Sequence, residues 1–369
     1  MNTAIDFQGS DSDRIQAAVD NASKNNGMAI VPSKEDGGAW MLDRAILLPS
    51  HTTLLLKNCH VKLSDRCRDN FIRSANCGMG ISNNIPAEDI HIIGEGNVIL
   101  EGADHPRSTG DAGKQCFRNT TELNWKRSFG TDEGVEGECQ RGDWRNIGIL
   151  FANVTGFSIS GFTMKNYHCW GISLEKCVKG MVTGINFNAH QNQEIFGEMQ
   201  TCLNRDGLDL RSGCRDIDIS DISGDTGDDI VALTSMVSGN CEGGQLGRTQ
   251  VTANSLEADN DTCNITIRNI SGKTKCAMIR LLCSENSPVH DVTICGVHDL
   301  SSDDNRTGCL LRIGETNPIY GAMGTIYNIS VSDVVSNANK CILMLYSLKN
   351  ARFNNIKNNN PNTDTFFVN

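Results

Sequence analysis

Four aspartates within residues 204–233 are the side chains of this sequence best suited to chemistry. Asp206 and Asp209 lie in the run Asn-Arg-Asp-Gly-Leu-Asp-Leu, and Asp228 and Asp229 lie in Gly-Asp-Asp-Ile-Val-Ala-Leu. Apolar residues flank both pairs, and carboxylates are rarely buried unless they are paired or used. The alternative to a functional site is that these acids cap turns, because Asp-Gly is ordinary turn chemistry.

The spacing of the two pairs favours a functional site. Asp206 and Asp228 are about 22 residues apart, close to the length of one coil of a β-solenoid. Adjacent strands in such a stack lie roughly 4.8 Å apart, so the carboxyl groups would share one patch. Two like charges at such a short separation drive the pKa values of the two groups apart. One acid can then stay protonated while its neighbour ionises. Hydrolysis of a glycosidic bond requires this division between a proton donor and a carboxylate that activates water.

A repeated strand pattern from residue 147 onward would position these acids. Each copy is a turn residue, often Asn, Asp or Gly, followed by alternating apolar positions, and neighbouring copies are roughly 24 to 49 residues apart. The copies begin at Asn153, Cys177, Cys214, Cys263, Val289, Ile326 and Asn350. A second strand type, such as 171–174, alternates with the first. We predict an all-β fold, a single-stranded right-handed parallel β-helix, because the two-residue hairpin turns of a sandwich are few.

Asparagines in the repeat also form Asn-x-Ser or Asn-x-Thr triplets. Triplets of this kind begin at Asn153, Asn264, Asn269 and Asn328. We interpret these four residues as turns of the coil and not as glycosylation sites.

The N-terminal region is expected to close one end of the solenoid. Residues 11–25 carry apolar residues at helical spacing, with Ser10 or Asp11 as the N-cap. A polar helix of this kind covers the open end of a stacked core. We therefore place a cap at about residues 8–35.

One long segment interrupts the strand pattern. Residues 103–145 are rich in glycine and charge and contain Trp125, Phe129 and Trp144. A long irregular insertion is usually a functional loop, and this one could wall a groove or be without function. We expect the whole chain, residues 1–369, to form a single β-helix domain that includes this insertion.

Charge and hydropathy restrict the partners of the protein. The formal net charge is -11 and the pI is about 5.2. We expect no nucleic-acid partner, because phosphate binding requires basic patches. We expect no membrane partner either, because no apolar run approaches the roughly 18 residues of a membrane span. No motif predicts an oligomeric state.

The cysteines and the N-terminus bear on the compartment. The 16 cysteines are scattered singly and no CxxC spacing appears, so we expect no metal and no cofactor. The first residues have neither a basic start nor an apolar core, so they do not form a signal peptide. We expect a cytoplasmic protein with mostly reduced thiols, and an extracellular one if a leader has been removed.

Several segments together carry a family resemblance. Residues 204–207 (Asn-Arg-Asp-Gly), followed one coil later by residues 227–229 (Gly-Asp-Asp), resemble the Asn-Thr-Asp and Asp-Asp motifs of polygalacturonase-like glycoside hydrolases of family 28. Residues 169–175 are similar to the Trp-Gly-Ile-His strand of that family, and residues 11–18 to its cap helix. The likeness extends from the cap to about residue 350, on a pectin-lyase-like right-handed parallel β-helix.

The resemblance implies an inverting hydrolase of pectic or related oligo- or polysaccharides. On this pattern Asp228 is the general acid, and Asp206 and Asp229 hold the attacking water. Asn204 is a substrate-binding candidate. An inverting enzyme separates its two carboxyl groups by roughly 6.5 to 9.5 Å.

The sequence departs from the family pattern on the next two coils. Residues 275–280 (Lys-Cys-Ala-Met-Ile-Arg) lack the histidine of the family's Gly-His-Gly strand, and residues 311–314 keep an arginine but lose the lysine of Arg-Ile-Lys. Arg280 and Arg312 remain candidates for pairing with an anionic sugar, since guanidinium matches carboxylate geometry. The alternative is that both are only cations beside the acidic cluster.

Two more binding candidates precede the strand one coil before Asp206. These are His168 and Trp170, whose ring could stack on a sugar or belong to the core.

Two other function classes remain open at this point. One is a metal-dependent polysaccharide lyase on the same helix, which a chelator would inactivate. The other is a non-catalytic glycan-binding β-helix that has lost part of the site. Replacing Asp228 with Asn separates an enzyme from a binding protein. An enzyme should lose hydrolysis and keep its affinity for the sugar, whereas a binding protein has no turnover to lose.

Overall fold

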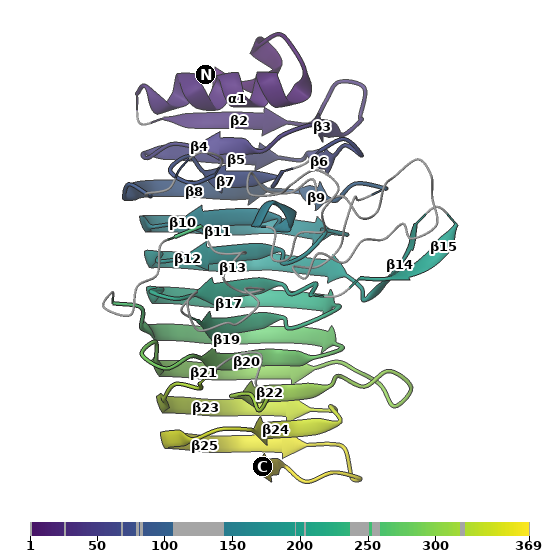
Figure 1. The fold of residues 1–369 in the computed structure, drawn as a ribbon. Coiled ribbons are helices and arrows are strands. Elements are labelled where there is room, and N and C mark those ends of the chain that lie inside the picture. The colour runs from purple at the N-terminus through teal and green to yellow at the C-terminus, as the bar shows by residue number, and fades with distance from the viewer. Residues whose placement is uncertain are drawn as a thin grey trace.

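The chain is a right-handed parallel β-helix in the computed structural model, with a helical cap at its N-terminal end (Figure 1). The strands stack along one axis, and the two termini lie at opposite ends of the stack. The described residues are 2–25, 27–67, 69–78, 81, 84–105, 144–195, 197–202, 204–236, 251–252, 259–317 and 322–368. Nearly all of the predicted insertion at 103–145 lies outside these residues.

The larger sheet contains 14 strands within the described residues and forms one side of the coil. Its main path is β1 (Asn2–Thr3), β2 (Met28–Pro32), β5 (Thr52–Lys57), β8 (Ala87–Glu95), β11 (Val154–Lys165), β13 (Val178–Ala189), β17 (Arg215–Thr226), β19 (Thr262–Thr274), β21 (Val289–Asp299), β23 (Ile326–Ser336) and β25 (Leu348–Asn358). A side path contains β3 (Trp40–Leu42), β6 (His60–Leu63) and β9 (Ile99–Glu101), which joins β11.

The smaller sheet contains ten strands within the same residues and forms the opposing side. In order these are β4 (Ile46–Leu48), β7 (Ile72–Ser74), β10 (Ile149–Ala152), β12 (Ile172–Glu175), β16 (Leu208–Arg211), β18 (Val231–Ser235), β20 (Ala277–Cys283), β22 (Cys309–Ile313), β24 (Lys340–Met344) and β26 (Phe366–Val368). The strands of both sheets pair in parallel, as the sequence pattern predicts; for example, Leu208 pairs with Val231.

The long strands of the larger sheet bend at residues with positive φ, which gives the coil its corners. On β19 these residues are Asn264 and Asn269, with φ of 54° and 57°. Asn153 and Asn328 also adopt positive φ, so all four asparagines predicted as turn residues have the backbone conformation of turns. Asparagine tolerates this region better than most residues do. Side-chain ladders reinforce the corners, since the Nδ2 atom of Asn264 donates to an aspartate of the preceding coil.

The two sheets differ in how their outer faces are covered. Strand β17 alternates buried and accessible positions, so one face packs on the core and the other meets water. Strands β16, β18 and β20 are buried at every position, so both faces of the smaller sheet are covered there. Side chains on the outer face of these three strands are therefore held in a buried environment.

The N-terminal cap follows the prediction. Helix α1 (Asp11–Ser23) begins at Ser10, whose Oγ accepts a hydrogen bond from the Asp13 amide while the Asp13 carboxylate accepts one from the Ser10 amide. The helix buries Ile15, Val19 and three small residues against the first coil. No helix in the described part of the chain has the length and apolar character to cross a membrane.

Three shorter elements complete the described fold. They are the 3-10 helices η1 (Ala4–Asp6) and η2 (Trp144–Asn146) and the antiparallel hairpin of β14 (Asn192–Ile195) and β15 (Glu198–Thr201). The hairpin projects from the side of the stack (Figure 1). It follows β13 and precedes the Asp206 segment, so it lies next to the predicted site along the chain.

Candidate active site

The β-helix stacks the two acidic motifs on adjacent coils, as the 22-residue spacing predicts. The Gly207 amide donates to the Asp229 carbonyl oxygen at 2.8 Å, and the Leu208 amide donates to the Ile230 carbonyl oxygen at 2.9 Å. Asp206 and Asp229 therefore hold equivalent positions, one rung apart, at the start of β16 and β18. Asp206 is 6% exposed and Asp229 is 2% exposed.

Close packing explains the glycine that follows Asp206. A Cβ atom on Gly207 would lie 2.5 Å from the Ile230 carbonyl oxygen and 2.7 Å from the Phe187 ring. The Asp-Gly step is thus required by contact with the next coil and with a core aromatic residue. Asn204, at the start of the same motif, has the left-handed backbone conformation of a turn, with φ of 57°.

Asp228 is the half-buried member of the acidic group. Its Oδ1 atom accepts a hydrogen bond from the Asp229 amide at 3.1 Å, and its own amide donates to the Arg205 carbonyl oxygen at 3.2 Å. Asp228, Asp229 and Cys276 each present one ligating atom, and these atoms lie within 4.8 Å of one another. Cys276 stands in the segment where the family pattern has a histidine.

Burial raises the pKa of Asp228 to about 7, and the negative charge of Asp229 contributes in the same direction. The hydrogen bond with Cys276 and the positive charge of Arg280 oppose the rise without cancelling it. Asp228 is therefore a half-buried residue whose carboxyl group keeps its proton near neutral pH. This is the property required of a general acid.

Asp229 is held from two sides. Its Oδ1 atom accepts a hydrogen bond from the Ala277 amide at 2.8 Å, and its Oδ2 atom lies 3.7 Å from Nη1 of Arg280. These two contacts fix the Asp229 carboxyl group beside Arg280. The two adjacent aspartates thus have different environments, because Asp228 is half-buried and Asp229 is almost fully buried beside a guanidinium group.

Arg280 and Arg312 face the same region and are paired in register on β20 and β22. Arg280 is 6% exposed and Arg312 is half-buried. Their common partner is Glu315, whose Oε2 atom accepts hydrogen bonds from Nη2 of Arg280 at 2.8 Å and Nη2 of Arg312 at 2.5 Å. Neither arginine is therefore a simple surface cation.

Glu315 and Cys276 are site residues that the sequence pattern does not reveal. Glu315 lies one residue beyond the segment 311–314 that resembles the family strand, and a carboxylate three residues after an arginine is a weak signal. Cys276 is visible in the sequence only as part of a segment without histidine. In both cases the role depends on contacts across coils.

Arg205 and Tyr167 form a buried layer beside the acids. Arg205 is 0% exposed and donates from Nη1 to the His190 carbonyl oxygen at 3.0 Å and from Nη2 to Gln193 at 2.5 Å. Burial raises the pKa of Tyr167 well above its ordinary value, and the charge of Asp206 adds to this. Arg205 thereby connects the acidic motif to the hairpin strand β14.

The two aromatic candidates of the preceding coil are enclosed. Trp170 is 4% exposed, and the Arg211 guanidinium carbon lies 4.6 Å from the centre of its ring. Trp170 belongs to a buried cluster with Trp144 and Leu150, in agreement with the alternative of a core tryptophan. His168 is also buried. Neither side chain presents an open surface for a sugar in this structure, and their assignment to binding stays a prediction.

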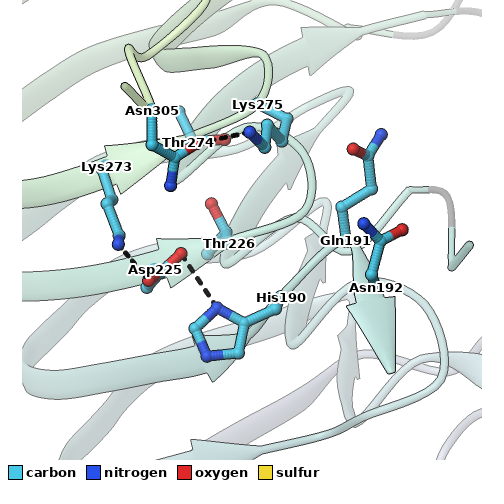
Figure 2. Close-up of a pocket in the computed structure, with 9 residues that line it drawn as sticks. All are labelled: His190, Gln191, Asn192, Asp225, Thr226, Lys273, Thr274, Lys275 and Asn305. Carbon is cyan, nitrogen blue, oxygen red and sulfur yellow. Dashed lines mark hydrogen bonds and ion pairs between the residues drawn. The ribbon is translucent and has the colours of Figure 1, made fainter. Parts of the chain in front are cut away.

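Figure 2 shows a pocket of about 260 Å³ whose lining begins two residues before Asp228, at Thr226 and Asp225. It is lined by His190, Gln191, Asn192, Asp225, Thr226, Lys273, Thr274, Lys275 and Asn305. The hydroxyl groups of Thr226 and Thr274 donate to the Asp228 carbonyl oxygen, which links the pocket to the acid. The carboxyl groups of the three candidate catalytic aspartates are not part of its lining.

The pocket has a central ion pair. Asp225 lies 3.1 Å from Nδ1 of His190 and 3.0 Å from Nζ of Lys273, and Lys275 contacts Asn305 (Figure 2). Its walls are therefore mainly polar, and they offer hydrogen-bonding groups that suit a hydroxylated ligand.

The cluster of Asp228, Asp229 and Cys276 also has donor atoms that a divalent metal could bind. However, Arg280 lies 3.7 Å from Asp229, and Nη1 of Arg312 lies 3.8 Å from the Cys276 sulfur. These guanidinium groups already compensate the charge that a cation would otherwise compensate. Carboxylate and thiol ligands together would favour a borderline metal such as zinc over calcium.

Comparisons with known proteins find similarity in structure but not in sequence. No protein-family profile matches the chain, and no curated protein matches it either. An exopolygalacturonase from Thermotoga maritima has a similar structure, with TM-score 0.58 and 16% identity, over 96% of this chain and 75% of that one. An endo-xylogalacturonan hydrolase from Aspergillus tubingensis matches with TM-score 0.53 and 13% identity, over 98% of this chain and 89% of that one.

A viral protein has a similar fold as well. The tailspike protein of E. coli bacteriophage HK620, solved in complex with a pentasaccharide, matches with TM-score 0.52 and 14% identity. The match spans 98% of this chain and 61% of the tailspike chain. At these identities the likeness concerns the fold, and the chain shares the right-handed parallel β-helix of these carbohydrate-acting and carbohydrate-binding proteins.

Proposed function

We propose that this protein is a glycoside hydrolase that cleaves a glycosidic bond in a pectic or related oligo- or polysaccharide. The observation that carries this proposal is the pairing of Asp228, half-buried with a pKa raised to about 7, with Asp229, buried beside a guanidinium group. Asp206 stands one rung away at the position equivalent to Asp229. Glycoside hydrolysis needs two carboxyl groups with different tasks, one that donates a proton and one that activates water.

The proposed roles follow from these environments. Asp228 donates its proton to the oxygen of the leaving sugar, because it is the acid that remains protonated near neutral pH. Asp229, together with Asp206, orients the attacking water and accepts its proton. Attack on the face opposite to the leaving group would invert the anomeric centre.

The stereochemical outcome is a separate part of the proposal. The closest oxygens of Asp228 and Asp229 lie within 4.8 Å, less than the roughly 6.5 to 9.5 Å typical of two carboxyl groups in inverting enzymes. If the reaction inverts, Asp206 is the member of the water-binding pair that we expect to supply the larger separation from Asp228. Proton NMR of the first-formed product anomer tests this directly.

The structural neighbours support a carbohydrate ligand. One of them is named as an exopolygalacturonase and another as an endo-xylogalacturonan hydrolase, and a third was solved with a bound pentasaccharide. The polar pocket beside Asp228 supports the same class of ligand. A screen of substrates identifies the particular sugar and linkage.

The decisive experiment is a hydrolysis screen with a matched pair of variants. Purified protein is incubated with acidic and neutral plant oligosaccharides, and reducing ends are measured. Asp228→Asn should abolish turnover and preserve binding, whereas Asp218→Asn, which removes an exposed carboxylate on β17, should leave turnover unchanged. Equal activity of the Asp228→Asn variant and the wild-type protein would refute the proposed role.

The pH profile provides a second test. Because the general acid must be protonated, kcat/KM should fall as the pH rises through about 7, the pKa of Asp228. A profile that stays flat to about pH 9 would contradict this assignment.

The donor atoms of Asp228, Asp229 and Cys276 leave a metal-dependent polysaccharide lyase as the second candidate. In that case a chelator would abolish activity, and the product would contain a double bond that absorbs ultraviolet light. A hydrolase without a metal would keep its activity in the chelator and give saturated products.

A further inference from the structure

Glu315 lies between Arg280 and Arg312, the two arginines that the sequence offers as partners for a sugar carboxylate. Its Oε2 atom accepts hydrogen bonds from both guanidinium groups, and its Oε1 atom accepts them from the amides of Thr316 at 2.9 Å and Asn317 at 3.3 Å. The residue is 7% exposed. Four donors therefore hold one internal carboxylate in place.

The backbone after β22 is built to return this side chain to the arginines. Gly314 adopts φ of 77°, and a Cβ atom there would lie 2.4 Å from the Tyr346 side chain. Only glycine combines that conformation with that contact. The turn places Glu315 back over the strand that carries Arg312.

Charge is already balanced around this group. Arg280 lies between Glu315 and Asp229, at 2.8 Å and 3.7 Å, and Arg312 contacts Glu315 and the Cys276 sulfur. Within the described part of the chain, these two guanidinium groups thus face the carboxylates of Glu315 and Asp229. A further carboxylate from a substrate would be a third anion against two cations, or would have to displace a buried group held by four donors.

Glu315 is ionised near neutral pH. Burial by itself would raise the pKa of its carboxyl group, but the Thr316 amide and the charges of Arg312 and Arg280 outweigh burial and lower that pKa below its ordinary value. The internal anion is therefore present under the conditions in which the enzyme would act.

We propose that Glu315 is a specificity-determining residue: it satisfies Arg280 and Arg312 internally, so that the sugar bound beside Asp229 is uncharged and not a uronate. This inference rests on the proposed glycoside hydrolase function and names the substrate class of the same site. Like charges placed together across a binding surface oppose association strongly, and at short range we expect a discrimination of roughly 10- to 100-fold.

The experiment compares two probes that differ only in charge. These are trigalacturonate and its carboxyl-reduced counterpart, which has the same linkage and ring configuration but a hydroxymethyl group in place of each carboxylate. The wild-type protein should hydrolyse the reduced trisaccharide at least about tenfold better in kcat/KM. Glu315→Gln removes the internal charge and should narrow or reverse this preference by roughly 10- to 100-fold.

A control variant and a salt series separate this role from a structural one. Glu95→Gln removes an exposed carboxylate on β8, paired with Lys57 and far from the site along the stack, and should leave the preference unchanged. In the wild-type protein, added salt should improve action on trigalacturonate by screening repulsion and should leave the reduced probe unaffected. The wild-type preference between the two probes needs no variant, so it keeps the proposal testable even if Glu315→Gln does not fold.

The outcomes are distinguishable. A wild-type preference for trigalacturonate, a salt series that weakens its binding, or an unchanged preference in folded Glu315→Gln would overturn this inference while the hydrolase proposal stands. Hydrolysis of neither probe nor of any glycan in the wider screen would overturn the hydrolase proposal, and the specificity proposal with it.

Discussion

Replacement of Asp228 by Asn should stabilise the protein above neutral pH while it abolishes turnover. The folded chain holds the Asp228 proton more tightly than the unfolded chain, because the pKa is raised from 3.8 to about 7. The ionisation of Asp228 therefore does not lower the unfolding free energy of the wild-type protein below about pH 4. It lowers that free energy increasingly as the pH rises toward 7. Asn has nearly the same shape, cannot ionise, and can still accept the hydrogen bond from the Asp229 amide.

The magnitude follows from the size of the shift. A rise of roughly three pKa units corresponds to about 4 kcal/mol of unfolding free energy between the acidic and the neutral limits. Relaxation around the ionised pair in the wild-type protein reduces the difference that is observed. We therefore expect Asp228→Asn to gain about 2 to 4 kcal/mol near pH 8 and almost nothing near pH 4.

Equilibrium unfolding in urea, followed by circular dichroism at several pH values, measures this difference. The gain should grow steadily between about pH 4 and 7 and then level off. Asp218→Asn, on the exposed face of β17, controls for the loss of one negative charge. The reasoning would be refuted by a difference that does not depend on pH, or by a variant less stable than wild type near pH 8.

Three further predictions test the fold itself. Gly180→Ala should destabilise the protein by about 1 to 3 kcal/mol, because the added Cβ would lie 2.0 Å from the Phe157 ring. Gly224→Ala is the control, since its Cβ would meet only ordinary van der Waals contacts. The midpoints of urea unfolding compare the two variants. Asn264→Ala should lower the unfolding free energy by about 1 to 2 kcal/mol, because alanine is strained at a φ of 54° and cannot donate the hydrogen bond to Asp216. Asn264→Gly should recover the part of this loss that comes from backbone strain. Urea unfolding measures both variants. Burial raises the pKa of the Cys177 thiol well above its ordinary value, so mass spectrometry should find it unmodified by iodoacetamide in the native protein and modified in urea; modification in the folded state would contradict its burial.

The architecture follows from the pattern of residues along the chain. Alternating apolar positions recur after turn residues at coil-length intervals, and only a stacked solenoid buries such a pattern continuously. The same periodicity was sufficient to predict that Asp206 and Asp229 occupy neighbouring coils, since a register of whole coils returns the chain to one face. The cap helix was equally readable, because Ser10 and the spacing of Ile15 and Val19 are local signals.

The character of the site depends on packing between distant parts of the chain. Both faces of the smaller sheet are buried at β16, β18 and β20, and burial raises the pKa of Asp228 just before β18. Trp170 is enclosed in a separate cluster with Trp144 and Leu150. The engagement of Arg280 by Glu315 likewise joins residues 35 positions apart. Periodicity specifies which residues share a face, but the dielectric environment and the pairing of charges depend on what the rest of the chain packs against that face.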